Sequence, residues 1–338
     1  MDKFLAPVDN RSKGARSWKP WPMSSSHREI FDPSHLRLGR TLREDGIVPG
    51  QSAGLVRVRR GVWLEQAEWD SLTPNDRHRA LVHATAMQCP DDQALVFSHA
   101  AAAALLGLPR IDAWPTTVDA LVPDRRIRGS ALIRKHIGAP STTAQVEGLW
   151  VTAPARTVID LARTTTLASG LAAADHALRV GLCTPDELAA EVATVPPYAQ
   201  GGRRSRLVVA LADARAESAL ESMSRAHMFQ LNLPRPELQR RYVDAEGFIG
   251  HVDFDWDGRI GEADGKGKYR IPDDASPRDA SEILWREKQR EDRLRRCSAG
   301  FVRWDWAVGA HPNRLAARLA EIGVRPQRRN TWLEDAAA

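Results

Sequence analysis

The last third of the chain has the most regular alternation of apolar and polar positions. It predicts a long helix, three short strands, a charged helix and a final strand, at Leu207–Leu231, Leu238–Val243, Phe248–Trp256, Arg259–Asp264, Asp279–Arg296 and Phe301–Trp306. Gly247 and the pair Asp257-Gly258 stand at the turns between the strands, and Asp-Gly is a strong hairpin signal. The predicted order is α-β-β-β-α-β, in which only the last strand can be a parallel crossover.

The front of the chain has a shorter pattern over residues 36–66. A helix is predicted at Leu36–Glu44, followed by a strand with Leu55, Arg57 and Arg59 in alternation and a hairpin with Gly61 in its turn. A helix followed by a basic hairpin is the part of a winged helix that remains when its first helices are missing. A hairpin that caps the next domain explains the same pattern equally well.

Residues 67–195 alternate predicted helices and strands, which is typical of an α/β domain. A capping box at Thr184 opens one of these helices, and Arg156 is expected to be a structural ion-pair partner. His99 follows a helix cap and precedes five alanines, so a structural histidine is expected there rather than a ligand. The remaining divisions are a disordered tail at 1–35, a linker at 196–204, the α-β-β-β-α-β domain at 205–310 and a C-terminal helix and tail at 311–338. The fold class predicted is multidomain, α/β and α+β.

Composition narrows the class of protein. The chain has 338 residues, 43% apolar and 27% charged, which is typical of a soluble protein with two or three domains. No run of eighteen apolar residues exists and no apolar segment opens the chain, so we expect no membrane span and no secretory signal, whether translation starts at Met1 or Met23. Three widely spaced cysteines argue against a disulfide framework or a zinc knuckle and favour a cytoplasmic setting. The net charge of +5 is compatible with a polyanionic partner.

The candidate functional site consists of carboxylates on the second predicted hairpin. Asp253 on one strand and Glu262 and Asp264 on the next would lie within about 5 Å across a tight Asp-Gly turn. Like charges at that distance repel, and Mg²⁺ or Mn²⁺ would remove the repulsion, polarise a phosphodiester and activate water. Acidic residues on a solvent-exposed strand face are the plainer explanation. The preceding helix adds Glu217 and Glu221, one turn apart, and the following helix is rich in arginine.

Several motifs in this region resemble one family. They are Ala216-Glu217-Ser218-Ala219-Leu220-Glu221-Ser222, Leu233-Pro234-Arg235-Pro236-Glu237-Leu238-Gln239, Val252-Asp253-Phe254, Gly261-Glu262-Ala263-Asp264-Gly265-Lys266-Gly267-Lys268-Tyr269, Arg286-Glu287-Lys288-Gln289-Arg290-Glu291-Asp292 and Val302-Arg303-Trp304. They are similar to the PD-(D/E)xK nuclease superfamily, in the branch related to very-short-patch-repair endonucleases. The resemblance implies a restriction-endonuclease-like core whose metal ligands are Asp253, Glu262 and Asp264.

The same resemblance implies further site residues. The catalytic set would be Glu221 (or Glu217), Asp253, Glu262, Asp264, Lys266 and Lys268. Asp264 stands where the superfamily has its lysine, and Lys266 or Lys268 would have to replace that lysine. Either the metal activates water alone or the site binds without cutting. The residues expected to contact nucleic acid are Arg59, Arg60, Gln239, Arg286, Arg290 and Arg293, with a solvated face as the plainer explanation for the last helix.

The front half resembles a second family. Val58-Arg59-Arg60-Gly61-Val62-Trp63, Phe97-Ser98-His99-Ala100-Ala101-Ala102, Leu106-Gly107-Leu108-Pro109 and Val151-Thr152-Ala153-Pro154-Ala155-Arg156-Thr157 look like AbiEi-type antitoxins of actinobacterial genomes. These are DNA-binding autorepressors with an N-terminal winged helix. The leading hypothesis is a metal-dependent DNA endonuclease with a regulator-like front half. The alternatives are an AbiEi-like regulator that binds DNA without cleavage, and an interaction protein of a defence locus. DNA and a cognate toxin or defence-locus protein are the expected partners, with no small-molecule cofactor.

Overall fold

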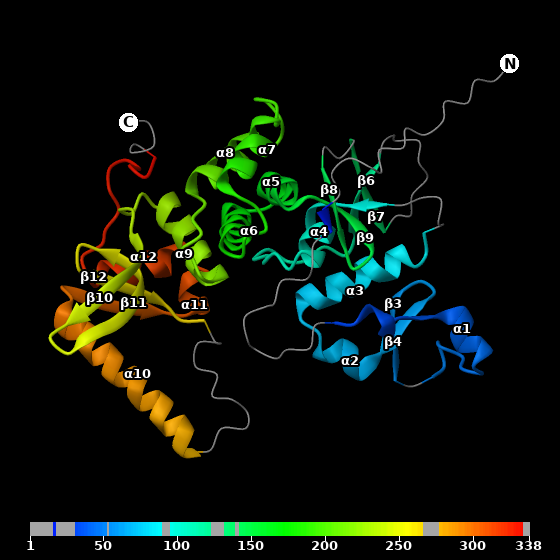
Figure 1. The fold of residues 1–338 in the computed structure, drawn as a ribbon, viewed down its shortest axis with the longest axis horizontal. Coiled ribbons are helices and arrows are strands. Elements are labelled where there is room, and N and C mark those ends of the chain that lie inside the picture. The colour runs from blue at the N-terminus through cyan, green and yellow to red at the C-terminus, as the bar shows by residue number, and fades with distance from the viewer. Residues whose placement is uncertain are drawn as a thin grey trace. The chain divides into compact units, whose positions relative to one another are not determined.

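A computed structural model describes residues 16–17, 31–52, 54–89, 95–122, 132–138, 142–265 and 277–333. The chain forms two compact units, Met1–Leu161 and Ala162–Ala338 (Figure 1). The linker predicted at 196–204 lies inside the second unit, where helix α8 begins, so the compact units divide at a different place from the predicted domains. In the described part of the chain, no helix is both long and apolar enough to cross a membrane.

The first unit opens with a small three-stranded antiparallel sheet. Its strands lie in the order β2 (Arg37–Leu38), β4 (Val62–Glu65) and β3 (Leu55–Arg59), accompanied by the short helix η1 (Pro33–His35) and by α1 (Gly39–Glu44), α2 (Gln66–Ser71) and α3 (Pro74–Ala86). The hairpin predicted around Gly61 is confirmed, with this glycine at φ +78° in the turn. The core of this sheet and α3 includes Val62, Leu64 and Ala80.

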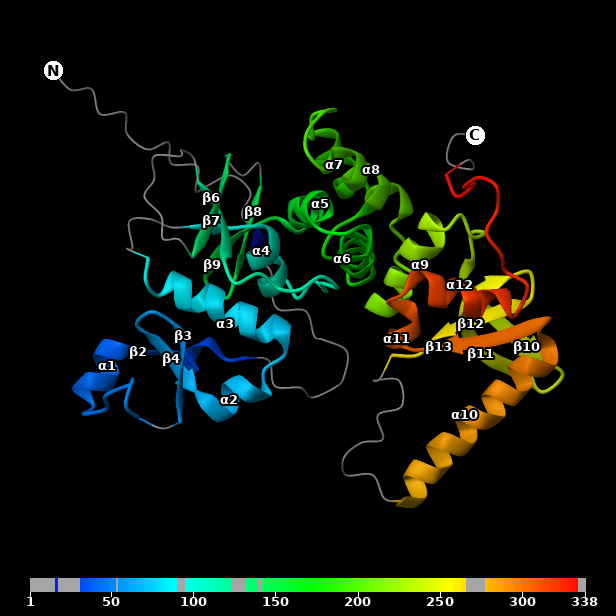
Figure 2. The same ribbon diagram turned by 180° about the vertical axis from the view of Figure 1, so that it is seen from behind.

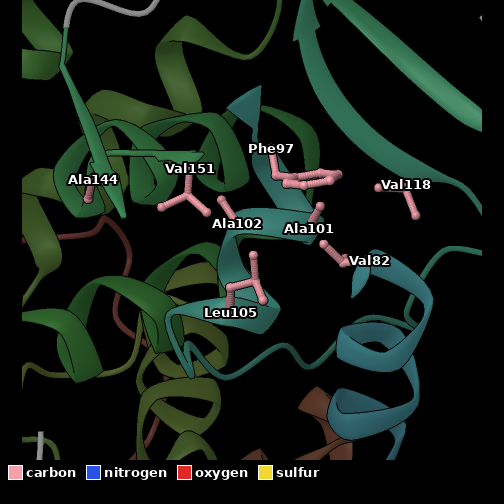
Figure 3. Close-up of a cluster of buried hydrophobic side chains, with 8 residues drawn as sticks. All are labelled: Val82, Phe97, Ala101, Ala102, Leu105, Val118, Ala144 and Val151. Atoms are coloured by element: carbon pink, nitrogen blue, oxygen red, sulfur yellow. The ribbon is translucent and has the colours of Figure 1, made fainter. Parts of the chain in front are cut away.

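A six-stranded mixed sheet forms the rest of the first unit. The strand order is β1 (Arg16–Ser17), β8 (Thr143–Val146), β9 (Leu149–Thr152), β5 (Val96–Phe97), β6 (Val118–Val122) and β7 (Ile133–Ile137). The helix α4 (His99–Leu105) turns Ala101, Ala102 and Leu105 toward Phe97 and Val151, as Figure 3 shows. The small alanine side chains let this helix lie close to the sheet. The helix α5 (Pro154–Thr164) follows, and the boundary between the units falls within it.

Helices open the second unit: α6 (Leu167–Arg179), α7 (Pro185–Ala193), α8 (Gly202–Leu211) and α9 (Ala219–Gln230). The capping box predicted at Thr184 is confirmed at the start of α7. The single helix predicted over Leu207–Leu231 is wrong, because the chain leaves the helix after Leu211 and starts a new one after Ser218. The Ser218 hydroxyl accepts the backbone N–H of Glu221 and so begins α9 independently.

A buried ion pair joins α6 to α9. Asp175 and Arg225 have side chains only 1% and 3% exposed, and their charged atoms lie 2.6 Å apart. The Asp175 carboxylate also accepts hydrogen bonds from the Ser222 hydroxyl and from the backbone N–H of Asp213. Arg225 donates its other nitrogen to the carbonyl of Leu211 at the end of α8. Three helices are therefore fixed by one fully partnered pair of charges.

The remaining part of the second unit is a four-stranded sheet. Its order is β10 (Glu237–Asp244), β11 (Gly247–Trp256), β12 (Arg259–Ala263) and β13 (Gly300–Trp304), and only β12 and β13 pair in parallel. The helix α10 (Pro277–Cys297) precedes β13, and α11 (Trp306–Gly309) and α12 (Pro312–Ala320) follow it. Figure 2 shows α10 extending well beyond the sheet at one end. The element order is therefore the α-β-β-β-α-β predicted, in a mixed α/β chain.

The last predicted strand ends two residues early. Trp304 is buried and its indole N–H donates to the Ser224 hydroxyl, whereas Trp306 begins α11 and is 42% exposed. Asp305 causes the change, because its carboxylate accepts the backbone N–H of Val308 and caps the new helix. Trp306 therefore does not lie on the strand that carries Trp304.

Candidate functional site

The hairpin of β11 and β12 brings the two predicted acids together. Phe254 pairs with Gly261 across the hairpin, so Asp253 and Glu262, one residue further from the turn, are cross-strand neighbours on the same face. Both side chains are buried, with 5% and 3% exposure. The Asp253 carboxylate accepts the backbone N–H of Ala263 at 2.8 Å, which fixes its orientation toward β12.

Gln239 links these acids to the helix that precedes the sheet. It lies opposite Asp253 on β10 at φ +53°, a region that non-glycine residues rarely occupy and that is often found at functional positions. Its amide nitrogen lies 3.3 Å from both Asp253 Oδ1 and Glu221 Oε2. Glu221 also accepts hydrogen bonds from the Ser218 hydroxyl and the Glu217 backbone N–H. Of the two helix acids expected, Glu221 is therefore held in place by the cap of its own helix.

A cavity of about 340 Å³ opens over these side chains. Its walls are formed by Glu217, Gln239, His251, Asp253, Glu262, Asp264, Glu287, Arg290 and Arg303. Five of these residues are acids and two are arginines, so the arginines leave an excess of negative charge. The structure thus brings Asp253, Glu262 and Asp264 to one cavity, whose other walls come from β10, β13, α10 and the segment before α9.

Two arginines bind the central acids directly. The Arg290 guanidinium, on α10, contacts both Glu262 oxygens, at 2.6 and 3.3 Å. Arg303, on β13, lies 3.4 Å from Glu262, and its Nε is 2.7 Å from Asp264. Arg303 also reaches Glu287 and Glu291 of α10 at 3.0 and 2.7 Å. Arg303 was not among the predicted site residues, and its only sequence signal is its place on the strand face opposite Trp304.

Burial raises the pKa of the Glu262 carboxyl, and the hydrogen bonds from Arg290 oppose that rise. The charge of this carboxyl in the folded chain therefore depends on its arginine partners.

The carboxylate oxygens that a divalent metal would bind have arginine partners in this arrangement. Mg²⁺ needs near-octahedral oxygen ligands at about 2.0–2.1 Å, and the oxygens of Glu262 and Asp264 already face guanidinium nitrogens. Among the described residues, no group of three or more histidine, cysteine, aspartate or glutamate side chains is placed to hold a metal ion. Lys266 and Lys268, expected to replace the missing lysine, lie outside the described residues.

The predicted nucleic-acid contacts divide into two groups. Arg60, at the hairpin tip, and Arg286, on α10, are exposed, although Arg286 pairs with Glu282. Arg290 and Arg293 are drawn into ion pairs, and the Arg293 guanidinium lowers the pKa of Asp244 to about 2. Gln239 lines the acidic cavity.

Arg59 must be removed from this set. It is 7% exposed and donates to the Thr85 hydroxyl of α3, because a bulge in β3 turns it inward. Arg57, on the same strand, is exposed in its place, and Arg40 and Arg43 of α1 are also exposed. Alternation along the strand favoured Arg57 and Arg59 equally, so the sequence could not separate them.

The first unit contains a second polar cluster, around the helix cap before α4. The His99 imidazole stacks on that of His136 with centroids 3.6 Å apart, and His136 Nε2 lies 2.8 Å from Asp119. Arg156 binds both oxygens of Asp160 at 3.0 Å, so its predicted role as a structural ion-pair partner is confirmed. His99 is buried at φ +48° among these groups, in keeping with a structural histidine.

Residues 94–209, from just before β5 into α8, match the family model of the AbiEi antitoxin C-terminal domain. Two curated relatives come from two strains of Mycobacterium tuberculosis and are named "Uncharacterized protein MT2308" and "Uncharacterized protein Rv2248". Each is 30% identical to the chain over 283 residues, which is 80% of this chain and 93% of the relative.

Proposed function

The chain belongs to the same family as these two mycobacterial proteins, and because it also carries the AbiEi antitoxin domain match, we propose that it is an antitoxin-type regulator that binds DNA without cleaving it. The domain match supports this function over the endonuclease expected first from the sequence. The antitoxin name of the matched domain also supports a cognate toxin as a protein partner.

The pairing of Glu262 with Arg290 and Arg303 is the observation that supports the proposed absence of cleavage. Phosphodiester hydrolysis by paired acids needs a cation that is open to a phosphate oxygen and to water. Here the charge of the buried acid is balanced by guanidinium groups that already donate to it. Such groups neutralise a carboxylate, but they cannot lower the pKa of a bound water as a metal does.

Support for DNA binding comes from the N-terminal module. Arg57 and Arg60 are exposed on and beside the β3–β4 hairpin, and Arg40 and Arg43 are exposed on α1. A helix and a hairpin of this kind can place arginines against the phosphate backbone, where each contact releases counterions. The chain's net charge of +5 acts in the same direction.

The experiment is a fluorescence-anisotropy titration of the full chain against the DNA upstream of its own gene. We compare wild type with the double variant Arg57→Ser/Arg60→Ser, and with Arg325→Ser as a control at an exposed arginine in the other unit. Loss of two phosphate contacts should reduce the slope of log Kd against log salt by roughly 2 and weaken binding at least about ten-fold. The control should bind as wild type does. Equal binding by all three proteins would contradict the proposal that the hairpin arginines contact DNA.

A parallel experiment tests the absence of cleavage. Supercoiled plasmid is incubated with wild type or with Asp253→Asn in Mg²⁺ or Mn²⁺. The proposal predicts no metal-dependent nicking by either protein. Nicking that requires metal and is lost in Asp253→Asn would overturn it and restore the endonuclease function.

A further inference from the structure

A second cavity, of about 1050 Å³, lies in the first unit and is far from the acidic hairpin in sequence. It is lined by β3, by the start of α3, by the segment 107–116 that follows α4, and by Trp69 and Leu132. Pockets that bury small ligands typically measure about 300–1,000 Å³. The cavity is therefore large enough for a ligand of drug or nucleoside size.

Two tryptophans give this cavity flat walls. The Arg77 guanidinium lies 5.3 Å from the ring centroid of Trp69, and that of Arg110 lies 5.9 Å from Trp114. Each arginine is tethered by a backbone carbonyl, Arg77 to that of Trp69 at 3.1 Å and Arg110 to that of Ala113 at 3.0 Å. The indole rings are thus held in place around an apolar space, which favours a planar occupant.

Two side chains of α3 that line the cavity have buried polar atoms without hydrogen-bond partners among the described residues. His78 is 3% exposed, its ring centroid lies 5.1 Å from that of Trp114, and by distance and angle neither of its ring nitrogens has a hydrogen-bond partner among the described residues. The buried side-chain oxygen of Asn75, one turn earlier, likewise has no partner there. Leaving such groups buried and unpaired is unfavourable. Two such groups side by side on one cavity wall are what a polar ligand edge would satisfy.

The chemistry of these groups defines that edge. Burial lowers the pKa of His78 to about 4, so at neutral pH the imidazole offers one donor and one acceptor. Asn75 adds an acceptor oxygen. Two acids, Asp76 and Asp112, line the cavity together with three arginines, Arg59, Arg77 and Arg110, so the charges of the lining nearly balance. The complementary molecule is uncharged, planar, and carries donors and an acceptor along one side.

We propose that this cavity binds a nucleobase-type heterocycle, with its hydrogen-bonding edge on His78 and Asn75 and its face against Trp114. Such a ring could come from a free nucleoside or from an unstacked base of a single strand, and the experiment separates the two. Val58 and Arg59 of β3 also line the cavity, and Arg59 is anchored to Thr85 of α3. An occupant would therefore touch the strand that carries Arg57. An effect of the ligand on DNA binding through this strand would rest on the proposed function. Binding of the ligand to the cavity does not rest on it.

The test is isothermal titration calorimetry of the full chain with adenosine, guanosine and cytidine, with a short single-stranded oligonucleotide, and with indole, which has a planar ring but only one donor. We expect saturable binding of a nucleoside or of the oligonucleotide, and weaker binding of indole. Binding of the oligonucleotide alone would identify a strand base as the source. If no nucleoside and no oligonucleotide binds wild type, the proposal is overturned.

Two variants assign the binding to the cavity. His78→Phe keeps the ring volume and removes the unpaired nitrogens, so it should bind at least roughly five-fold more weakly without a lower melting temperature. Asn75→Ala, at a partly exposed position, is the second variant and should weaken binding in the same direction. His176→Phe, on α6 outside the cavity, is the matched control and should bind as wild type does. Unchanged affinity in both cavity variants would overturn the proposal, whatever the outcome of the DNA experiments.

Discussion

Replacing Arg225 with methionine should destabilise the second unit far more than replacing an exposed arginine nearby. The change removes the guanidinium that lies 2.6 Å from Asp175, whose side chain is 1% exposed. Asp175 would keep its bonds from Ser222 and from the Asp213 backbone, but its charge would have no counterion. Methionine retains much of the arginine stem, so the packing between α6 and α9 is largely preserved.

The magnitude follows from the burial of the pair. Removing one partner of a buried ion pair typically destabilises a protein by about 3–5 kcal/mol, because the other charge stays buried without compensation. In a unit of this length, each 1 kcal/mol lowers the melting temperature by about 2–4 °C. We therefore expect a decrease of roughly 10 °C for the unfolding transition of this unit.

The loss should also depend on pH. Burial raises the pKa of Asp175 to about 6, against the opposing charge of Arg225. For an acid with a raised pKa, stability is greatest below the unfolded value near 4 and is lost as pH rises through 6. Without Arg225 this pKa rises further, so the carboxyl is neutral at pH 5 and needs no counterion. The difference between Arg225→Met and wild type should therefore be larger at pH 8 than at pH 5.

Thermal unfolding followed by circular dichroism at both pH values measures the effect. Arg215→Met is the matched control, because Arg215 also pairs with an aspartate, Asp213 at 2.8 Å, but is 55% exposed. An exposed pair of this kind contributes about 0–1 kcal/mol. If Arg225→Met lowers the melting temperature no more than Arg215→Met does, or if it lowers it equally at both pH values, the reasoning about this buried pair is refuted.

Three further changes have defined outcomes. Gly201→Ala should destabilise the second unit by about 3 kcal/mol or more, because Gly201 has φ +73° and an added Cβ would collide with the Arg163 backbone; circular dichroism melting measures the loss. Thr184→Ala removes the capping box of α7 and should lower the free energy of unfolding, measured in urea, by about 1 kcal/mol. Burial lowers the pKa of His78 and His83 to about 4, so their stabilising contribution is present above about pH 6.5 and is lost toward pH 4. In His78→Phe the melting temperature should therefore fall less between pH 6.5 and pH 4 than it does in wild type.

Local signals in the sequence were sufficient for most elements of the second unit. The Asp257-Gly258 turn and the alternation on either side of it predicted the β11–β12 hairpin, and with it the meeting of Asp253 and Glu262. The break between α8 and α9 was missed, because apolar periodicity continues through it. The chain leaves the helix at Ala212, and the capping serine, Ser218, starts the new one.

Contacts between distant segments could not be derived in the same way. Nothing near Asp175 in the sequence indicates that Arg225, three helices later, will neutralise it. The bulge that turns Arg59 inward depends on the partner strand and on Thr85, so alternation alone could not show that Arg57 is the exposed arginine of the strand. Similarly, the cavity beside His78 is formed by β3, α3 and a later loop, which no local pattern relates.

The departure from the nuclease pattern and the two arginines of the acidic cavity are connected. Where the resembled superfamily has a lysine, this chain has Asp264, which adds a negative charge beside two buried carboxylates. Such a set of acids needs cations to remain buried, whether metal ions or guanidinium groups. Arg303 reaches both Asp264 and Glu262, and Arg290 takes the other oxygen of Glu262. Asp264 thus adds a negative charge to the cluster, and the same arginine that pairs with it also helps to balance the charge of the buried Glu262.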